Sequence, residues 1–289
     1  MTHDGQKLYV GTKYGLITID KATGTQTLLN SSNSALPNDK VFSTVMHEGI
    51  LWVGLDSAYV SEITPEQICN HHYPWNIFED NPFPFEDDFP FTHHITSIAF
   101  GPSEVMYISQ LSDFARVVND QIEGTVRVGS TKLDSSGIEV MKVDANGVLW
   151  IAYNVGGRIN FSLSRYTPEE GLVYPMADFD ESLFPLGKDM MDSRAMDIDA
   201  DGHVWIGCRG GYLAEYDGET FRFYELIVGV SQYVRPFEDL AFDANGTLWC
   251  ITYDGRLISR SGEEITVRQL ELVEGEFLNQ KGTILKKIA

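Results

Sequence analysis

Hydrophobic residues recur along the chain in one short pattern that appears six times. The six copies are Leu8-Tyr9-Val10-Gly11, Leu51-Trp52-Val53-Gly54, Met106-Tyr107-Ile108-Ser109, Leu149-Trp150-Ile151-Ala152, Val204-Trp205-Ile206-Gly207 and Leu248-Trp249-Cys250-Ile251. Four of the five tryptophans occupy the second position of this pattern, and tyrosine occupies it in the other two copies. A repeated apolar segment of this kind predicts one strand per repeat and an architecture built from similar units.

The spacing and the turns between strands define the unit. Successive copies begin 43, 55, 43, 55 and 44 residues apart. A second apolar run precedes each copy, followed by a turn such as Asp144-Ala145-Asn146-Gly147 or Asp243-Ala244-Asn245-Gly246. Asn-Gly and Asp-Gly between strands are strong hairpin signals, because these residues tolerate positive φ. A unit of about 45 residues with three or four antiparallel strands is one propeller blade. The sequence therefore predicts an all-β, six-bladed β-propeller, a single domain over residues 1–289.

The two ends of the chain supply complementary parts of one unit. The chain begins at what should be a second strand, Lys7-Leu8-Tyr9-Val10, and ends with the strand-like run Gly282-Thr283-Ile284-Leu285-Lys286-Lys287-Ile288. We expect the C-terminal strand, at about 279–288, to complete the N-terminal blade. This closure would remove the open edges that a sheet must otherwise protect.

Two long connections between units, at about 64–92 and 167–192, account for the longer spacings. The first is rich in aromatic and acidic residues and contains Trp75, the one tryptophan outside the repeated pattern. Loops beyond about 15 residues are usually functional or disordered, and so many aromatic residues argue against disorder. Two interpretations stay open. The loops form an aromatic, acidic rim that grips a partner or covers the channel mouth, with Trp75 as an anchor, or their rings pack down on the blades.

The charge of the chain limits its partners. Lys and Arg total 21 against 42 Asp and Glu, which gives a formal net charge of −21. Such a surface repels phosphate, so it argues against nucleic acid and anionic membranes, while a basic protein partner or a small polar ligand fits. Three scattered cysteines suit neither a disulfide framework nor a zinc site. The sequence shows no signal peptide and no membrane span, which predicts a cytoplasmic location.

Polar residues expected on the inner strands and on the loop-rich top face form the candidate ligand site. Charges near a ring centre must be paired, hydrated or functional. The candidates are Trp75, His94, Tyr153, Arg194, Arg209, Glu238, Asp239 and Tyr253. The alternative is a water-filled channel with paired charges, surrounded by solvated turn residues.

No motif assigns a catalytic residue, a metal ligand or a cofactor, and only a divalent cation in the channel is left open. The pairs His71-His72 and His93-His94 lack a metal-ligand spacing, and neighbouring residues of a strand face opposite ways. The run 197–202 resembles the start of a calcium loop, but Cys208 stands where the bidentate carboxylate is required. We interpret this run as a blade turn.

The first unit resembles the repeat of the two-component regulator propeller family. The matching residues are Gly11-Thr12, Gly15-Leu16, Asp20, Thr23-Gly24, the run 33–38 and Leu51-Trp52-Val53-Gly54. A weaker similarity to streptogramin-lyase-like propellers covers most of the chain, without their histidine and glutamate set. The resemblance implies a propeller fold and a binding role, since the family typically supplies ligand-binding sensor domains. The chain contains no kinase or DNA-binding segment, so the signalling role is not implied.

These observations favour a non-catalytic binding module that recognises a protein segment or a small polar ligand at the loop-rich top face. The alternative is a metal-dependent lyase or hydrolase with its site at the mouth of the central channel, near Arg194, Glu238 or His94.

Overall fold

The chain folds into two compact units, which are described separately. The computed structural model describes residues 1–74, 94–110, 113–128, 137–153, 163–175, 181–191, 194–234, 236–243, 245–269, 272–273 and 284–285. The first unit comprises Met1–Ile151 and Ser164–Val173, and the second comprises Ala152–Leu163 and Tyr174–Ala289. The single domain expected from the sequence stays a prediction.

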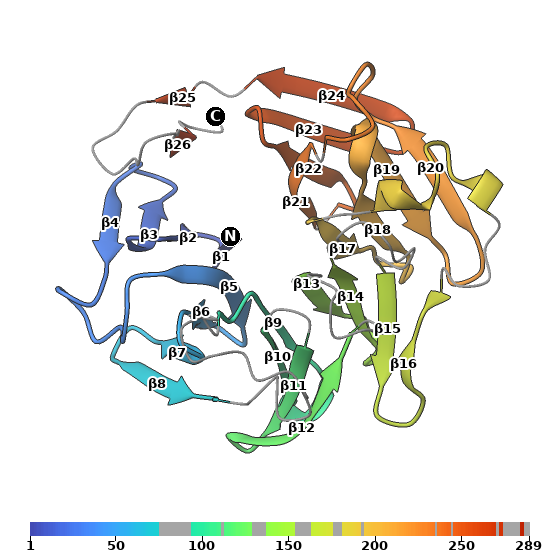
Figure 1. The fold of residues 1–289 in the computed structure, drawn as a ribbon. Helices are drawn as coiled ribbons and strands as arrows, with labels where there is room; N and C mark the ends of the chain where they lie inside the picture. The colour runs from blue at the N-terminus through green and yellow to red at the C-terminus, as the bar shows by residue number, and fades with distance from the viewer. Residues whose placement is uncertain are drawn as a thin grey trace, which may run out of the picture. The chain divides into compact units, whose positions relative to one another are not determined.

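Six four-stranded antiparallel sheets make an all-β, six-bladed β-propeller, which confirms the predicted fold class (Figure 1). The first sheet contains β1 (Thr2–His3), β2 (Lys7–Thr12), β3 (Gly15–Asp20) and β4 (Gln26–Leu29), and the second contains β5 (Val41–His47), β6 (Ile50–Leu55), β7 (Tyr59–Ile63) and β8 (Ile68–His72). The third sheet contains β9 (Ser97–Phe100), β10 (Met106–Gln110), β11 (Asp113–Val118) and β12 (Gln121–Arg127). The fourth contains β13 (Ile138–Val143), β14 (Leu149–Tyr153), β15 (Leu163–Thr167) and β16 (Gly171–Val173).

The second unit holds the last two blades. These sheets are β17 (Met196–Ile198), β18 (Val204–Gly207), β19 (Tyr212–Tyr216) and β20 (Phe221–Glu225), and β21 (Phe237–Phe242), β22 (Leu248–Thr252), β23 (Arg256–Ser261) and β24 (Glu264–Gln269). A two-stranded pair follows, β25 (Leu272–Val273) with β26 (Ile284–Leu285). The connections contain short 3-10 helices, η1 (Pro102–Glu104), η3 (Glu181–Leu183), η4 (Lys188–Met191) and η5 (Arg209–Gly211).

Each copy of the repeated pattern lies on the second strand of its sheet, as the sequence predicts. Its first and third residues supply core side chains: Leu51 is 3% exposed and Val53 is fully buried. The aromatic residue at the second position points to the other face, because successive side chains of a strand alternate. The pattern therefore encodes both the pairing register and the core of each blade.

An aspartate closes the turn before this strand and binds its aromatic residue, an arrangement we call the aspartate–aromatic clamp. Oδ1 of Asp243 accepts backbone N–H groups of Asn245 (2.9 Å) and Thr247 (3.0 Å), and its Oδ2 accepts Nε1–H of Trp249 (2.9 Å). The hydrogen bond from Trp249 and those from the backbone hold the pKa of Asp243 below its ordinary value. The clamp recurs as Asp144 with Trp150, Asp199 with Trp205, and Asp4 with the Tyr9 hydroxyl.

The second blade lacks the clamp. Its β5–β6 turn is shorter, with His47 paired to Ile50 and only Glu48 and Gly49 between them. No aspartate is therefore available to Trp52, whose Nε1–H is buried without a hydrogen-bond acceptor among the described residues.

Glycine at the fourth position of the pattern lets the next blade approach. A Cβ at Gly54 would lie 2.6 Å from the Ile95 carbonyl oxygen, and one at Gly207 would lie 2.7 Å from Phe237 Cβ. Gly11 meets Val41 in the same way. Each contact joins the second strand of one blade to the segment that begins the next blade.

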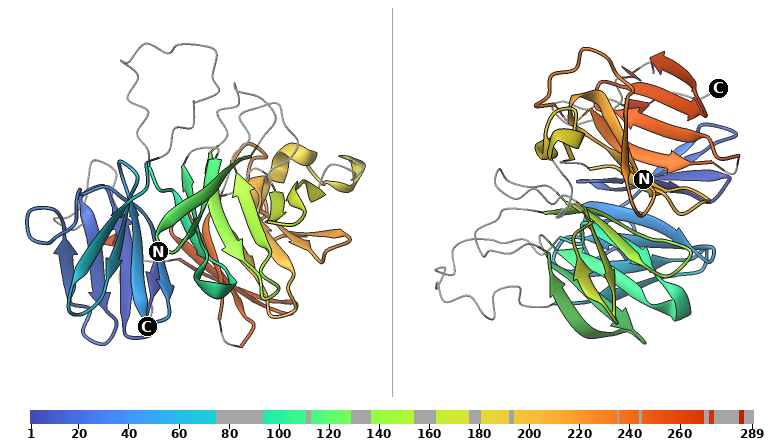
Figure 2. Two further views of the ribbon diagram at one scale, coloured as in Figure 1. Left: turned by 90° about the horizontal axis from the view of Figure 1, so that it is seen from below. Right: turned by 90° about the vertical axis from the view of Figure 1, so that its right-hand side faces the viewer.

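One end of each sheet carries the connections. Because strands alternate in direction, the turn between the second and third strands and the link to the next sheet lie at the same end, which we call the connection end. Figure 2 shows η3 and η4, in yellow, at the connection end of the β17–β20 sheet. The aspartate–aromatic clamps close the opposite end.

The closure of the first blade differs from the prediction. Thr2 pairs with Tyr9 and His3 with Leu8, so the chain's own first residues form the inner strand β1. The turn at Asp4 makes this possible, since its side chain accepts the backbone N–H groups of Gln6 and Lys7. Of the segment 279–288, only Ile284–Leu285 is described, and it pairs with Leu272–Val273.

The two long connections are shorter than predicted. The segment 64–92 contains the fourth strand β8, and the segment 167–192 contains the fourth strand β16. β8 carries a mostly polar sequence, Ile-Cys-Asn-His-His, and β16 is only three residues long, Gly-Leu-Val, so neither shows the apolar alternation of the inner strands. Trp75 lies outside the described residues.

Candidate functional site

β-Bulges turn two side chains outward at the connection end. The register of β5 on β6 shifts between Val41 and Ser43, and that of β21 on β22 shifts between Phe237 and Asp239. The residues in between, Phe42 and Glu238, are exposed. Bulges commonly redirect side chains beside functional sites. Here they place one aromatic ring and one carboxylate on the surface while the preceding residues stay packed.

The predicted site residues that are described lie at the connection ends of their own sheets. His94 and Arg194 precede β9 and β17, Arg209 begins η5, Glu238 lies near the start of β21, and Tyr253 lies in the β22–β23 turn. Arg194 approaches Glu238 to 4.0 Å, and both side chains are 44% exposed.

Tyr153 and Asp239 belong to the structure of their strands. Tyr153 is 2% exposed, because it ends β14, a strand whose five residues are all buried. A ligand on the surface would not contact this ring. Asp239 accepts the backbone N–H of Leu240 (2.9 Å) beside the bulge of β21.

In the first unit, His94 is part of a cluster with Phe42, Asp56 and Lys40. His94 Nδ1 lies 2.9 Å from Asp56 Oδ1, and Lys40 Nζ lies 2.9 Å from Asp56 Oδ2. The imidazole stacks on Phe42 at a centroid distance of 4.0 Å. Burial acts to raise the pKa of Asp56, but hydrogen bonds from Lys40 and the Ser57 N–H, with the nearby His94, hold it below its ordinary value. The cluster places an imidazole between an aromatic ring and a carboxylate at the connection end.

In the second unit, four segments form one surface that we call the loop platform: 181–191, Arg209–Gly211, the β20–β21 connection and the turn 253–255. Gly210 N–H donates to the Val234 carbonyl (3.0 Å), and Tyr253 N–H donates to the Pro236 carbonyl (2.9 Å). Gly210 also packs so closely on Leu186 that a Cβ there would lie 2.4 Å from its Cδ1. The platform is therefore tied together by backbone hydrogen bonds and close packing.

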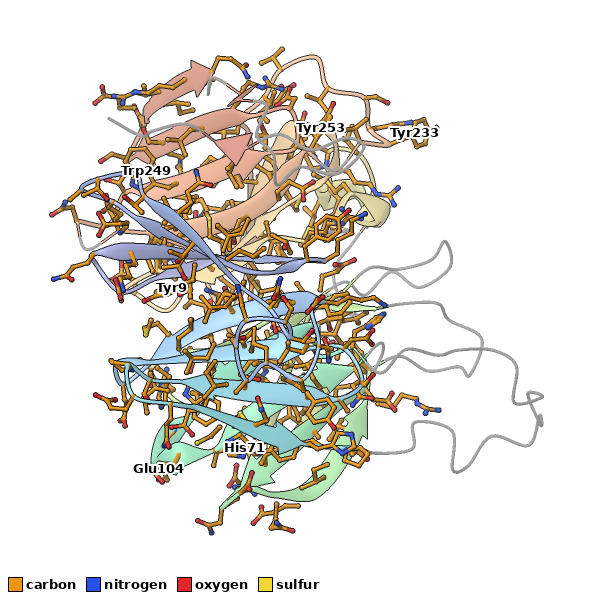
Figure 3. The ribbon with its side chains drawn as sticks, turned by 90° about the vertical axis from the view of Figure 1, so that its left-hand side faces the viewer. Tyr9, His71, Glu104, Tyr233, Trp249 and Tyr253 are labelled. Atoms are coloured by element: carbon orange, nitrogen blue, oxygen red, sulfur yellow. The ribbon has the colours of Figure 1, made fainter. Side chains whose placement is uncertain are left out.

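The loop platform exposes large apolar and aromatic side chains. Val228 is 81% exposed, Tyr233 76%, Tyr253 59% and Leu183 57%. Tyr233 and Tyr253 lie on the same side of the second unit, whereas Trp249, beside its clamp, lies on the opposite side (Figure 3). Tyr253 was predicted from the sequence; Leu183, Val228 and Tyr233 were not. The 11-residue β20–β21 connection was the available signal for the latter two.

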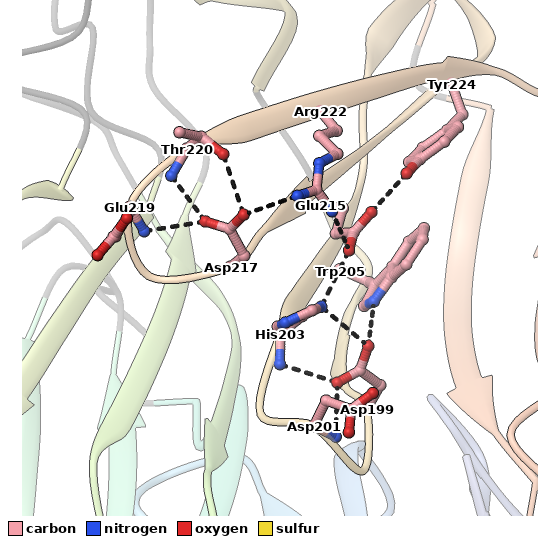
Figure 4. A network of polar contacts seen from close by, with 10 residues as sticks. All are labelled: Asp199, Asp201, His203, Trp205, Glu215, Asp217, Glu219, Thr220, Arg222 and Tyr224. Atoms are coloured by element: carbon pink, nitrogen blue, oxygen red, sulfur yellow. Dashed lines mark hydrogen bonds and ion pairs between the residues drawn. The ribbon is translucent and has the colours of Figure 1, made fainter.

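A larger polar network lies at the clamp end of the fifth blade (Figure 4). Glu215, 5% exposed, accepts the Tyr224 hydroxyl (2.5 Å) and approaches His203 Nδ1 (2.9 Å) and Arg222 Nη1 (3.4 Å). Burial, followed by the hydrogen bond to Glu215, raises the pKa of Tyr224. Arg260 of the last blade covers the Tyr224 ring at 4.0 Å and the Trp205 ring at 4.8 Å. The buried carboxylate is surrounded by its own donors, so the network joins two blades and is a stabilising element.

The described residues contain no group of three or more His, Cys, Asp or Glu side chains arranged to hold a metal ion. The divalent cation left open by the sequence stays a prediction. In the part of the chain that is described, no helix has the length and apolar character needed to cross a membrane.

No family model and no curated protein matches the sequence. Among solved structures, the chain is similar to a catalytically inactive virginiamycin B lyase from Staphylococcus aureus with quinupristin, at a TM-score of 0.68 and 14% identity over 94% of this chain and 85% of that one. It is also similar to the extracellular domain of a protein described as a hybrid two-component system from B. thetaiotaomicron (0.52, 13%, 90% and 39%) and to a chain of the mitotic checkpoint complex (0.58, 10%, 91% and 73%).

These similarities establish the propeller fold, and with it the fold implied by the resemblance to two-component regulator and streptogramin-lyase-like propellers. Identities of 10–14% carry no information on ligand or activity. The cytoplasmic location stays a prediction.

Proposed function

We propose that the chain is a non-catalytic binding module and that the loop platform docks a polypeptide segment. The observation that carries the proposal is the exposure of Leu183, Val228, Tyr233 and Tyr253 on loops that are held together by backbone hydrogen bonds and close packing. Exposed apolar groups gathered in one region mark interaction sites more often than single scattered ones do. Tyrosine provides large contact area at a low cost in conformational entropy, and a preformed surface lowers that cost further.

The distribution of exposed apolar side chains among the described residues also favours the connection end of the sheets as the binding surface. Of nine exposed large hydrophobic residues, six lie in connection-end segments. These are Tyr14, Phe42, Leu183, Val228, Tyr233 and Tyr253. Four of the six lie on the loop platform of the second unit, and a protein segment that contacts several of its loops fits these side chains better than a small polar ligand does.

Differential capture tests the proposal. The immobilised full chain is compared with the double variant Tyr233→Ala/Tyr253→Ala and with a matched control, Ile265→Ala/Val267→Ala. The control removes two exposed apolar residues from β24, outside the platform. We expect a protein from the lysate of the source organism to be retained by the wild type and the control and lost from the platform variant. Equal retention by all three proteins would refute the platform as the binding site.

The alternative, a metal-dependent lyase or hydrolase, has one observation in its favour. His94 Nδ1 lies 2.9 Å from Asp56 Oδ1 at the connection end, and histidines beside carboxylates serve as general bases and metal ligands. The test is the thermal stability of the wild type and of His94→Ala with Mg²⁺, Ca²⁺ or Zn²⁺. A metal-dependent rise lost in His94→Ala would support this alternative, and no rise with any of the three ions would reject it.

A further inference from the structure

The loop platform belongs to a strongly acidic protein, and this determines which polypeptides it attracts. The formal net charge is −21 over 289 residues. A field of this sign raises the local concentration of cationic partners and repels anionic ones, within the reach allowed by salt.

Two arginines that border the platform, Arg256 and Arg194, have carboxylate neighbours. Arg256 Nη2 lies 2.6 Å from Asp254 Oδ2, and its Nε donates to Asp254 Oδ1 (3.1 Å). Arg194 faces Glu238. The ion pair with Arg256 also holds the pKa of Asp254 below its ordinary value, so this carboxylate stays ionised at neutral pH. A cationic segment would therefore meet the ionised carboxylate of Asp254 next to the exposed Tyr253.

The exposed tyrosine rings offer a second means of recognising cations. Aromatic faces attract ammonium and guanidinium groups. The same chain shows this contact elsewhere, with Arg260 over Tyr224 at 4.0 Å and Lys13 Nζ over Tyr14 at 5.0 Å. Tyr233 and Tyr253 are more than half exposed, so their rings are accessible to an incoming cation.

Resting on the function proposed above, we infer that the partner segment is basic: lysine or arginine side chains of the segment lie on the rings of Tyr233 and Tyr253, and its apolar side chains contact Val228 and Leu183. Charge selects the segment at long range, and the aromatic and apolar contacts fix it on the platform.

Peptide selection tests the inference without assuming a partner. A library of random 12-residue peptides displayed on phage is selected on the immobilised full chain, on Tyr233→Ala/Tyr253→Ala and on the control Ile265→Ala/Val267→Ala. We expect peptides enriched on the wild type and the control, relative to the platform variant, to be rich in lysine and arginine and to contain apolar residues. A labelled synthetic copy of the most enriched peptide should bind the platform variant about tenfold more weakly, bind Tyr233→Phe/Tyr253→Phe with near wild-type affinity, and lose affinity as salt rises.

The outcomes separate the inference from the proposed function. Neutral or acidic peptides that depend on the tyrosines would overturn the inference and leave the platform as the binding site. Basic peptides enriched equally on all three proteins would show attraction by charge alone and would overturn the inference. The absence of any enrichment would also overturn it, and differential capture would then decide the proposed function by itself.

Discussion

Replacing Gly54 by alanine should destabilise the first unit, because the neighbouring blade leaves no room for a methyl group at this position. Gly54 lies where β6 meets the segment that begins the third blade. A Cβ on this residue would lie 2.2 Å from Ser43 Oγ, 2.6 Å from the Ile95 carbonyl oxygen and 2.7 Å from Ile95 Cγ2. One of these atoms belongs to the backbone, so a change of side-chain rotamer cannot relieve the overlap.

The magnitude follows from two contributions. Overpacking a close-packed core costs about 1–3 kcal/mol. The intruding methyl group would also displace the Ser43 hydroxyl from the Ile95 carbonyl, to which it donates at 3.0 Å, and the loss of such a hydrogen bond costs about 1 kcal/mol. The free energy of unfolding should therefore fall by about 2–4 kcal/mol.

Urea denaturation followed by circular dichroism measures the effect, with two glycines as controls. Gly124 of β12 has open space around an added Cβ, so Gly124→Ala should be neutral or stabilising by about 0.5 kcal/mol. Gly207→Ala would meet only side-chain atoms of Phe237 and should lie between the two. A midpoint for Gly54→Ala no lower than that of Gly124→Ala, at unchanged m-value, would refute the close approach of the blades.

Three further predictions follow from the clamps, the turns and the cysteines. Trp249→Phe should destabilise the protein by about 1 kcal/mol more than Trp52→Phe, because Trp249 donates a hydrogen bond to an aspartate and Trp52 does not. Equal losses in the free energy of unfolding, measured by urea denaturation, would contradict this prediction. Backbone hydrogen bonds from Thr220 and Glu219 hold the pKa of Asp217 down at about 2. Its stabilising effect is therefore complete above pH of about 4 and is lost as the pH falls toward 2, and Asp217→Asn should flatten the acid side of the stability profile. Burial raises the pKa of Cys208, so native protein should react with a thiol reagent at the partly exposed Cys69 and not at Cys208 until it is unfolded.

The sequence was sufficient for the fold because every blade repeats the apolar pattern of its second strand and most blades repeat the aspartate turn before it. Apolar residues at alternate positions set the second strand, and Asp-Ala-Asn-Gly supplies both the turn and the acceptor for the following tryptophan. The sequence was insufficient where a strand has no such pattern. β1 has two residues and forms because Asp4 organises the turn after it, and β8 pairs through its backbone along a mostly polar sequence.

The site was predicted less well because exposure at the connection end depends on tertiary packing. Tyr153 and Tyr253 both follow or end a second strand, yet one is 2% exposed and the other 59%. Tyr153 is the last residue of β14 and shares the core face of Leu149 and Ile151, whereas Tyr253 follows the last residue of β22 and lies in the turn, so the place of each ring relative to the end of its strand separates them. Phe42 and Glu238 reach the surface through bulges, and a shift of one residue in register leaves no mark on the pattern of apolar residues.

The two ends of the blades differ in a way that bears on function. At the clamp end, an aspartate binds the aromatic residue of the second strand in four of the six four-stranded sheets, so the chemistry there is repeated and its polar groups are satisfied within these four blades. At the connection end, segments of different length expose different residues, from Phe42 beside His94 in the first unit to the tyrosines of the loop platform in the second. A blade stabilised from one end tolerates variation at the other. Substitutions of Tyr233 and Tyr253 should therefore change binding while leaving the free energy of unfolding within about 0.5 kcal/mol of wild type, and a larger loss of stability would mean that these rings serve the fold instead.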